Sequence, residues 1–216
     1  MEYFSRLIAL LLLLALSPVI FFITLFCIIF QGFPILFVQK RIGFNYEVFN
    51  IYKFRTMVIN SGQIITSHQD NRITLLGRVL RKLKIDEIPQ LINIIKGEMR
   101  FIGPRPEVPD FFDEFEFNFL MEIKPGLSDY SSILFRNESR ILKKIGGENP
   151  YSILLPIKIE LAKYYARNKR FLLDLKLVVV TLISIVLPNL SWRILTIIFE
   201  DEYLPKTKNF LNEYHF

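Results

Sequence analysis

The sequence predicts an α+β protein in which an apolar N-terminal helical segment precedes a mostly helical domain with a small β-hairpin. Three observations predict it: an almost uninterrupted apolar run, a stretch of two-residue alternation after it, and helical periodicity in the later segments. A chain of 216 residues suits one domain with membrane elements. We therefore divide the chain into an anchor at residues 1–31 and one domain at residues 32–216.

Composition and charge narrow the class of protein. Hydrophobic residues make up 51% of the chain and the mean hydropathy is +0.33, both high for a soluble globule. A net charge of +6 and a pI near 9.4 fit either nucleic acid or an anionic membrane surface. Because the N-terminus is apolar, we favour the membrane and expect no nucleic-acid partner. The single cysteine, Cys27, excludes an internal disulfide and fits a reducing compartment.

The apolar run Leu7–Phe30 is long enough to cross a bilayer core of about 30 Å. Arg6 is the only basic residue before this run, and no small-residue cleavage site follows it. We therefore expect a retained anchor and not a signal peptide. Proline removes a backbone hydrogen bond, so Ser17-Pro18 should bend the helix near its middle. The bent helix either spans the bilayer or returns as a re-entrant hairpin, and hydropathy alone favours the span. Four basic residues place the following domain in the cytoplasm: Lys40, Arg41, Lys53 and Arg55.

Two extended segments are predicted between Pro34 and Met57, around a turn at Gly43-Phe-Asn45. The second segment alternates with the two-residue period of a strand, so Lys53 and Arg55 point to the same side. That side is either a solvated strand face or the rim of a functional site.

A basic amphipathic helix is predicted from Ile73 to Ile85, directly before the adjacent carboxylates of Asp86 and Glu87. Such a helix packs its apolar face against a core. Its basic residues can also lie along anionic headgroups, at about 1 kcal/mol for each residue near the surface. The apolar face consists of Leu76, Val79, Leu80 and Leu83. The basic residues are Arg78, Arg81, Lys82 and Lys84.

The stretch Lys84–Pro106 holds the strongest candidates for chemistry. Helical spacing of its apolar residues, Pro89 in the first turn and Lys96-Gly97 at the end predict a short helix from Glu87 to Lys96. Asp86 then lies at the N-terminal mouth, either as an N-cap or as an ionised carboxylate that can act as a nucleophile. Nearby cations suit a phosphate-bearing ligand: Arg78, Arg81, Lys82, Lys84, Arg100 and Arg105.

Arg105 lies between two prolines in Gly-Pro-Arg-Pro. Pro104 and Pro106 each fix φ, and Pro106 also keeps Arg105 out of the α region. The stiff backbone presents the guanidinium with little conformational freedom to lose. The alternative is a proline-rich loop with an incidental arginine.

The remaining segments predict packing. Glu107–Glu122 mixes phenylalanines with acids and predicts a core helix, and Pro156–Asn168 predicts another. Val58–Asn71 is polar and predicts a loop near the site. Within Leu172–Phe199, the uninterrupted part Leu177–Leu187 is too short to span a membrane as a helix, so we interpret it as interfacial or buried.

These residues resemble the bacterial sugar transferase family, the monotopic phosphoglycosyl transferases, in the small form that is little more than a catalytic core. The shared stretches keep the family order and cover most of residues 1–127: Ser17-Pro18, Gly32-Phe-Pro-Ile-Leu-Phe-Val-Gln-Lys-Arg-Ile-Gly43, Tyr52-Lys-Phe-Arg-Thr-Met57, Asn71-Arg-Ile-Thr74, Gly77-Arg-Val-Leu-Arg81, Asp86-Glu-Ile-Pro-Gln90, Lys96-Gly-Glu-Met99, Gly103-Pro-Arg-Pro106 and Lys124-Pro-Gly-Leu127. In one departure, Ala162-Lys163 precedes Tyr164-Tyr165 where many members carry an aspartate, so no site is transferred to that region.

The resemblance implies a re-entrant membrane hairpin in place of the span, with a cytoplasmic catalytic domain and interfacial amphipathic helices at the bacterial inner membrane. It implies transfer of a sugar-1-phosphate from a UDP-sugar to polyprenyl phosphate, with Mg²⁺ as cofactor and release of UMP. By matched position, Asp86 is the nucleophile that carries the phosphosugar and Glu87 is its dyad partner; both would ligate Mg²⁺. The residues implied in substrate binding are Lys53, Arg55, Arg81 and Arg105.

Two other classes of protein share some of these features. A non-enzymatic basic membrane adaptor explains the anchor and the charge, but gives no reason for Asp86-Glu87 or for the proline-flanked Arg105. A P-loop or Rossmann nucleotide-binding protein fails because neither glycine motif occurs in the chain. Membrane lipids are expected partners, and a homodimer is compatible with the sequence.

Overall fold

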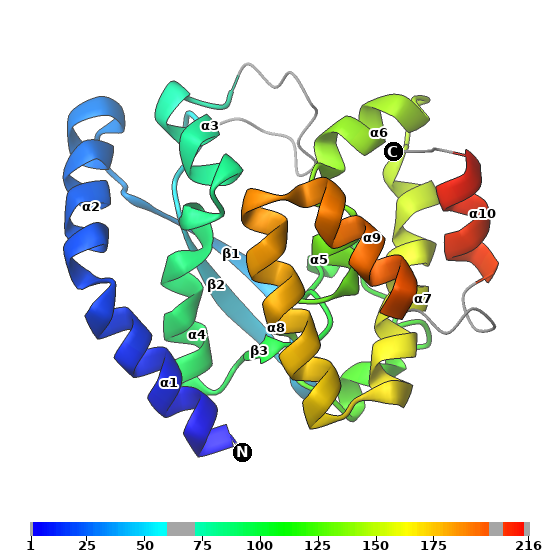
Figure 1. The fold of residues 1–216 in the computed structure, drawn as a ribbon. Coiled ribbons are helices and arrows are strands. Elements are labelled where there is room, and N and C mark those ends of the chain that lie inside the picture. Colours follow the sequence, from blue (N-terminus) through cyan, green and yellow to red (C-terminus); the bar gives the residue numbers. More distant parts are fainter. Residues whose placement is uncertain (1, 60–71, 199–204, 214–216) are drawn as a thin grey trace.

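The computed structural model describes residues 2–59, 72–198 and 205–213, and it has the predicted α+β class, with helices packed around two small sheets (Figure 1). Most of the loop expected at Val58–Asn71 lies outside these residues. The elements in chain order are α1 (Glu2–Ala15), α2 (Ser17–Gln31), β1 (Leu36–Ile42), η1 (Phe44–Tyr46), β2 (Val48–Phe54), α3 (Leu75–Lys82), η2 (Ile85–Gln90), α4 (Leu91–Lys96), β3 (Arg100–Ile102), η3 (Pro109–Phe111), η4 (Asn118–Met121), β4 (Gly126–Ser128), α5 (Tyr130–Leu134), α6 (Glu138–Ile145), α7 (Tyr151–Asn168), α8 (Phe171–Val186), α9 (Pro188–Ile198) and α10 (Pro205–Glu213).

The predicted bend in the apolar anchor is confirmed. Helices α1 and α2 meet at Leu16 with a bend of 61°, and Pro18 lies in the first turn of α2, where its missing N–H breaks no helical bond. The Ser17 hydroxyl donates to the Leu14 carbonyl at 2.7 Å and so satisfies one acceptor at the break. In the part of the chain that the structure describes, no single helix passes as a membrane span, whereas α1 and α2 together pass. The re-entrant course stays a prediction.

Both anchor helices pack one side against the domain and leave the other side exposed and apolar. In Figure 1 they run along one edge of the molecule, beside α4 and α3. Ala9 of α1 is buried in a cluster with Leu91 and Ile94 of α4, and Ile23 and Cys27 of α2 belong to a cluster with α3. The exposed side includes Phe4, Leu7, Leu11, Leu14, Phe21, Phe22, Phe26, Ile29 and Phe30.

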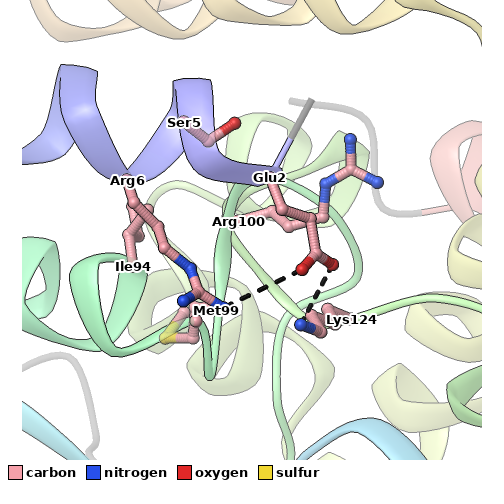
Figure 2. A pocket seen from close by; sticks show the side chains of 8 residues that line it. Glu2, Ser5, Arg6, Ile94, Met99, Arg100 and Lys124 are labelled. Carbon is pink, nitrogen blue, oxygen red and sulfur yellow. Dashed lines mark ion pairs between the residues drawn. The ribbon is translucent and has the colours of Figure 1, made fainter.

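Charged residues fix the first turn of α1 to the domain (Figure 2). Glu2 pairs with Lys124 at 3.0 Å and more loosely with Arg6 at 3.9 Å. The Arg6 guanidinium lies over Gly97, the left-handed residue (φ 80°) that ends α4, and it occupies the space that a Cβ there would need. The left-handed backbone conformation therefore favours a glycine at this position, whereas the flexible Arg6 side chain could move away from a Cβ.

The predicted β-hairpin is confirmed. Strands β1 and β2 pair antiparallel from Leu36↔Phe54 to Ile42↔Val48, and η1 forms the turn. The Asn93 amide of α4 donates to the Asn50 carbonyl at 2.6 Å and accepts from the Tyr52 N–H at 3.3 Å. The hairpin is thereby tied to the helix that follows the carboxylate pair.

The core helix predicted at Glu107–Glu122 is wrong. This segment forms only the short 3₁₀ turns η3 and η4. Pro109 removes one backbone donor, and the Asp113 side chain accepts from the N–H groups of Phe115 and Glu116, which competes with helical bonding. The segment still packs, because Phe117 and Phe119 are buried in the main core.

The C-terminal helices build the main core around a two-stranded parallel sheet of β3 and β4. Helix α7 contains the predicted Pro156–Asn168 helix but begins earlier, at Tyr151. Helix α8 buries one side in the main core and exposes an apolar one, so this stretch is buried in part, and its interfacial position stays a prediction. The exposed side of α8 includes Phe171, Leu172, Leu175, Val179, Leu182 and Val186.

A close approach at Gly77 gives a stability prediction. A Cβ at this position in α3 would overlap the backbone carbonyl of Thr56, which cannot move as a side chain can. We expect Gly77→Ala to lower the free energy of unfolding by about 1–3 kcal/mol. The exposed residue Arg78 of the same helix serves as control, with a change for Arg78→Ala within about 0.5 kcal/mol. Thermal unfolding measures both, and equal effects would contradict the packing argument.

Candidate active site

The carboxylate pair lies in a 3₁₀ segment, which corrects the predicted helix. The predicted Glu87–Lys96 helix is divided into η2 and α4, and α4 begins only at Leu91. Lys84 takes the N-cap position in a left-handed conformation (φ 58°), and Asp86 follows inside the first turn of η2. Asp86 is therefore not the N-cap. The left-handed residue turns the chain sharply between α3 and the pair, so that the basic helix and the carboxylates adjoin.

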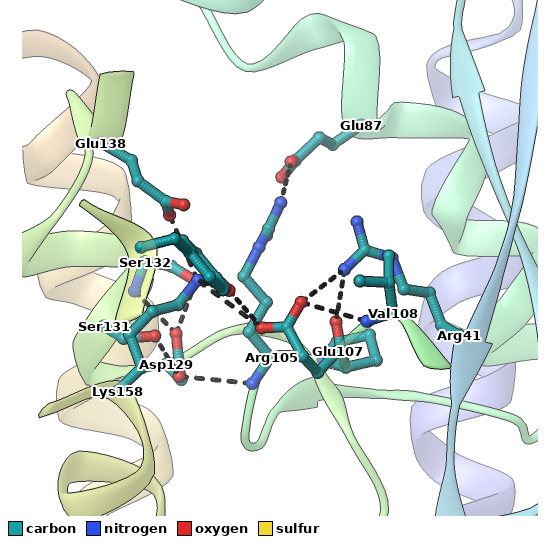
Figure 3. Close-up of polar contacts among 12 residues, drawn as sticks. Arg41, Glu87, Arg105, Glu107, Val108, Asp129, Ser131, Ser132, Glu138 and Lys158 are labelled. Atoms are coloured by element: carbon teal, nitrogen blue, oxygen red, sulfur yellow. Dashed lines mark hydrogen bonds and ion pairs between the residues drawn. The ribbon is translucent and has the colours of Figure 1, made fainter. Parts of the chain in front are cut away.

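Glu87 is held by cations from three separate parts of the chain. One carboxylate oxygen, Oε1, accepts from Lys53 Nζ of β2 at 2.9 Å and from Arg105 Nη2 at 3.0 Å. Lys84 Nζ lies 3.8 Å from the same oxygen. Figure 3 shows the Arg105 side chain extended toward Glu87. Sequence positions 53, 84, 87 and 105 thus meet at one carboxylate.

The two adjacent carboxyl groups are electrostatically different. Burial alone would raise the pKa of Glu87, but Lys53, Lys84 and Arg105 outweigh it and lower that pKa well below its usual value. The pKa of Asp86 is raised, by burial and by the negative charge of Glu87, against the opposing effect of nearby cations. The expectation that the surroundings of Asp86 favour its ionised form is therefore wrong for the protein without ligands.

Asp86 retains an unused acceptor. Asp86 is 7% exposed, and its buried Oδ1 atom has no hydrogen-bond partner among the residues that the structure describes. Buried polar atoms normally have partners, so this oxygen can accept a hydrogen bond from water or a ligand, or coordinate a cation. Among the described residues, no three ligating side chains gather as a metal cluster. Mg²⁺ commonly uses one or two carboxylates together with substrate phosphates, so the pair Asp86 and Glu87 fits it.

The two other predicted arginines lie differently with respect to the pair. Arg81 Nε donates to the Thr56 hydroxyl at 2.8 Å, and its charge acts on Asp86. The Arg55 guanidinium instead donates to backbone carbonyls where α2 ends, among them that of Phe33 at 3.1 Å and that of Gly32 at 2.7 Å. The structure therefore brings Lys53, Arg81 and Arg105 to the pair, and uses Arg55 to fix the anchor to the hairpin.

A buried polar network supports the Arg105 loop, and sequence reasoning missed it. The N–H of Arg105 donates to Asp129 at 3.3 Å, and the next acid, Glu107, accepts from Arg41 at 3.3 Å and from the Tyr151 hydroxyl at 2.5 Å (Figure 3). Glu107 directly follows the Gly-Pro-Arg-Pro motif, and Arg41 ends the Gln-Lys-Arg stretch of the first strand. No sequence pattern indicates that these two residues form an ion pair. The network holds Arg105 beside Glu87.

Comparisons with known proteins show the family of this chain. The family model described as "Bacterial sugar transferase" matches residues 2–188, so the chain belongs to the bacterial sugar transferase family.

Relatives in this family carry specific names. The exopolysaccharide production protein ExoY of Sinorhizobium fredii is 32% identical over 209 residues, which cover 88% of this chain and 86% of the relative. The UDP-N-acetylgalactosamine-undecaprenyl-phosphate N-acetylgalactosaminephosphotransferase of Aeromonas hydrophila is 38% identical over 70% of this chain. The undecaprenyl-phosphate glucose phosphotransferase of Komagataeibacter xylinus is 45% identical over 46% of it. The matches span only 35% and 19% of these last two relatives.

Proposed function

We propose that this protein transfers a sugar-1-phosphate from a UDP-sugar to undecaprenyl phosphate and releases UMP, as the first membrane step of glycoconjugate assembly. The observation that carries the proposal is the unequal carboxylate pair: Glu87 is held by three cations, and the adjacent Asp86 keeps a buried oxygen free. The names of the relatives support the same reaction type.

The proposed reaction has two displacements at one site. An oxygen of Asp86 attacks the β-phosphorus of the donor, the bond from this phosphorus to the bridging oxygen breaks, and UMP leaves with the electron pair. A phosphate oxygen of the lipid then attacks the aspartyl phosphosugar and restores the free Asp86 carboxylate. Two displacements through one nucleophile predict ping-pong kinetics.

The surrounding cations stabilise the charge of the donor. Lys53, Lys84 and Arg105 already neutralise one carboxylate, and Arg81 acts on the other. Mg²⁺ held by Asp86 and Glu87 would neutralise the donor diphosphate. A bound Mg²⁺ would lower the pKa of Asp86 and so favour the ionised nucleophile that burial disfavours.

We further propose that the site lies at the cytoplasmic face of the inner membrane. The exposed apolar sides of α1, α2 and α8 would face lipid, and the bent pair α1–α2 would enter the bilayer as a re-entrant hairpin. The acceptor is a lipid, so the carboxylates must lie where its phosphate can reach them. The anchor and the Asp86 segment adjoin through α4, which supports this placement.

Incubation of the purified protein with undecaprenyl phosphate, Mg²⁺ and a panel of UDP-sugars tests the proposal through the release of UMP. We expect UMP release with at least one donor, and we expect this release to require Mg²⁺. A membrane adaptor releases none with any donor, and that result would contradict the proposal.

The Lys53 ammonium gives a pH prediction. Burial lowers the pKa of Lys53 from 10.5 to about 8, although Glu87 raises it in part. If this cation contacts the donor, activity should fall about tenfold per pH unit above about 8. From pH 8 to 10.5 the unfolded chain binds more protons at this group, so the group's contribution to stability rises with pH. The titration of Lys53 therefore does not itself destabilise the fold in this range.

The matched variant for this pH profile is Lys53→Arg, because arginine stays charged throughout the range. Initial rates of UMP release between pH 6.5 and 10 should show the alkaline fall shifted upward in the variant. An alkaline fall at the same pH in both proteins would assign it to another group.

A further inference from the structure

A pocket at the first turn of α1 gathers basic side chains away from the carboxylate pair (Figure 2). It is lined by α1, by the end of α4, by Arg100 of β3 and by Lys124, which precedes β4. Helix α4 separates the pocket from the pair, because its first residue, Leu91, follows η2 whereas Gly97 at its other end lines the pocket. The proposed reaction makes no use of this pocket.

The Glu2 carboxylate occupies the pocket as an internal anion. Its Oε1 lies 3.0 Å from Lys124 Nζ, and its Oε2 lies 3.9 Å from Arg6 Nη2. The hydrogen bond from Lys124 lowers the pKa of Glu2, so this carboxyl group is ionised at neutral pH. The Glu2 side chain is 54% exposed, and it can therefore turn away into water while the cations stay in place. The pocket is suited to an oxyanion, and the one that it holds is replaceable.

Positive charge exceeds negative charge around this pocket. Lys169 follows α7 and lies close enough for Glu2 and Arg100 to act on its pKa, which burial lowers. The Nε atom of Arg6 is buried and has no hydrogen-bond partner among the described residues. Two acids therefore face more cations than they neutralise. The acids are Glu2 and Asp174, and the cations are Arg6, Arg100, Lys124 and Lys169.

Arg100 differs from the other three cations, because its guanidinium already pairs with Asp174 at 3.6 Å. The basic side chains that Asp174 does not pair with are Arg6, Lys124 and Lys169, which we call the basic cluster. They come from three separate segments: α1, the turn before β4, and the turn between α7 and α8. The fold therefore brings these charges together.

Exposed apolar side chains border the basic cluster on two sides. Tyr3 and Phe4 of α1 are exposed, and so are Phe171 and Leu172, which begin α8 two residues after Lys169. Both helices contact β3, and their first turns lie at the same end of the molecule (Figure 1). A small soluble anion would use only the charges. An amphiphile with an anionic head and acyl chains would use both the charges and the apolar flanks.

We propose that the basic cluster binds the phosphate of an anionic phospholipid, whose acyl chains lie along the exposed apolar faces of α1 and α8. The lipid phosphate takes the place of the Glu2 carboxylate, and the bound lipid fixes the start of the anchor at the membrane surface. This inference rests on the proposed membrane placement and not on the proposed transfer reaction.

The test measures binding of labelled phosphatidylglycerol to the full chain in a neutral detergent, without donor. We expect saturable binding, and binding of phosphatidylcholine at least about tenfold weaker. Lys124→Gln and Lys169→Gln should each raise the apparent Kd roughly fivefold. Glu2→Gln should lower the apparent Kd about threefold or more, because it removes an internal competitor for the same cations.

The Lys163–Glu116 ion pair supplies the matched controls. Its distance is 2.7 Å, and its side chains are 30% and 49% exposed, against 21% and 54% for Lys124 and Glu2. Lys163→Gln and Glu116→Gln change the net charge in the same way as the test variants, but away from the basic cluster. Both controls should leave the apparent Kd for phosphatidylglycerol unchanged.

Four results would each overturn the inference. Weaker or unchanged binding in Glu2→Gln would reduce Glu2 to a structural tie of α1. Equal retention of phosphatidylcholine would assign the binding to the apolar faces alone. Displacement by millimolar glycerol phosphate would indicate a site for free phosphate, and binding of undecaprenyl phosphate alone would assign the pocket to the acceptor. The assay contains no donor, so UMP release by the wild type tests the transferase function separately.

Discussion

Asp86→Asn is expected to abolish turnover. The amide keeps the shape of the side chain but is a poor nucleophile, so no phosphosugar can be carried and UMP release should fall by roughly 10³-fold or more. The unpartnered Oδ1 of Asp86 means that few native hydrogen bonds are lost in the exchange. Initial rates of UMP release with saturating donor and lipid measure the effect.

The control for this prediction is Asp110→Asn, a substitution of the same chemistry at an exposed position of η3. It should leave the rate unchanged. Both variants should sediment with membranes as the wild type does, since neither residue belongs to the anchor. Substantial residual turnover in Asp86→Asn would show that another group attacks the donor.

Replacement of Arg105 has the second-largest expected effect. Arg105→Ala removes a cation that lies 3.0 Å from Glu87 and faces the donor site, and turnover should fall by about 100-fold or more. Arg105→Lys should recover only part of this loss, because lysine offers a point charge in place of the planar fork of donors. The measurement is kcat/KM for the donor, with thermal unfolding of each variant alongside.

Arg100→Ala separates catalysis from stability. Arg100 lies in β3, just before the Arg105 loop, and pairs with Asp174 at 3.6 Å with similar side-chain exposure, 20% against 23% for Arg105. Its loss should affect unfolding to a similar extent but change kcat/KM less than about threefold. If Arg100→Ala and Arg105→Ala reduce activity equally, the effect of Arg105 is only structural.

Local sequence signals predicted the elements that depend on local causes. The anchor bends next to Pro18, the residues that alternate after Gly43 form β2, and α4 ends at Lys96-Gly97. Each of these is determined by the backbone preferences of a few neighbouring residues. The helix predicted at Glu107–Glu122 does not form, and the cause is again local. Pro109 and Asp113 both interfere with helical hydrogen bonding, and the prediction gave more weight to the pattern of phenylalanines.

Contacts between distant segments could not be predicted in this way. The pairing of Lys53 with Glu87 depends on how the hairpin docks on η2, and the alternation in β2 does not reveal that Arg55 binds backbone carbonyls at the end of α2. The raised pKa of Asp86 results from burial, which no local motif encodes.

Covalent capture of the phosphosugar tests the central claim most directly. The protein is incubated with Mg²⁺ and a donor labelled in its β-phosphate, without lipid acceptor, and its intact mass and bound label are measured. We predict one sugar phosphate per chain, located by peptide mapping at Asp86, absent from Asp86→Asn and discharged by undecaprenyl phosphate. An enzyme that turns over both substrates but never carries the label would contradict the account.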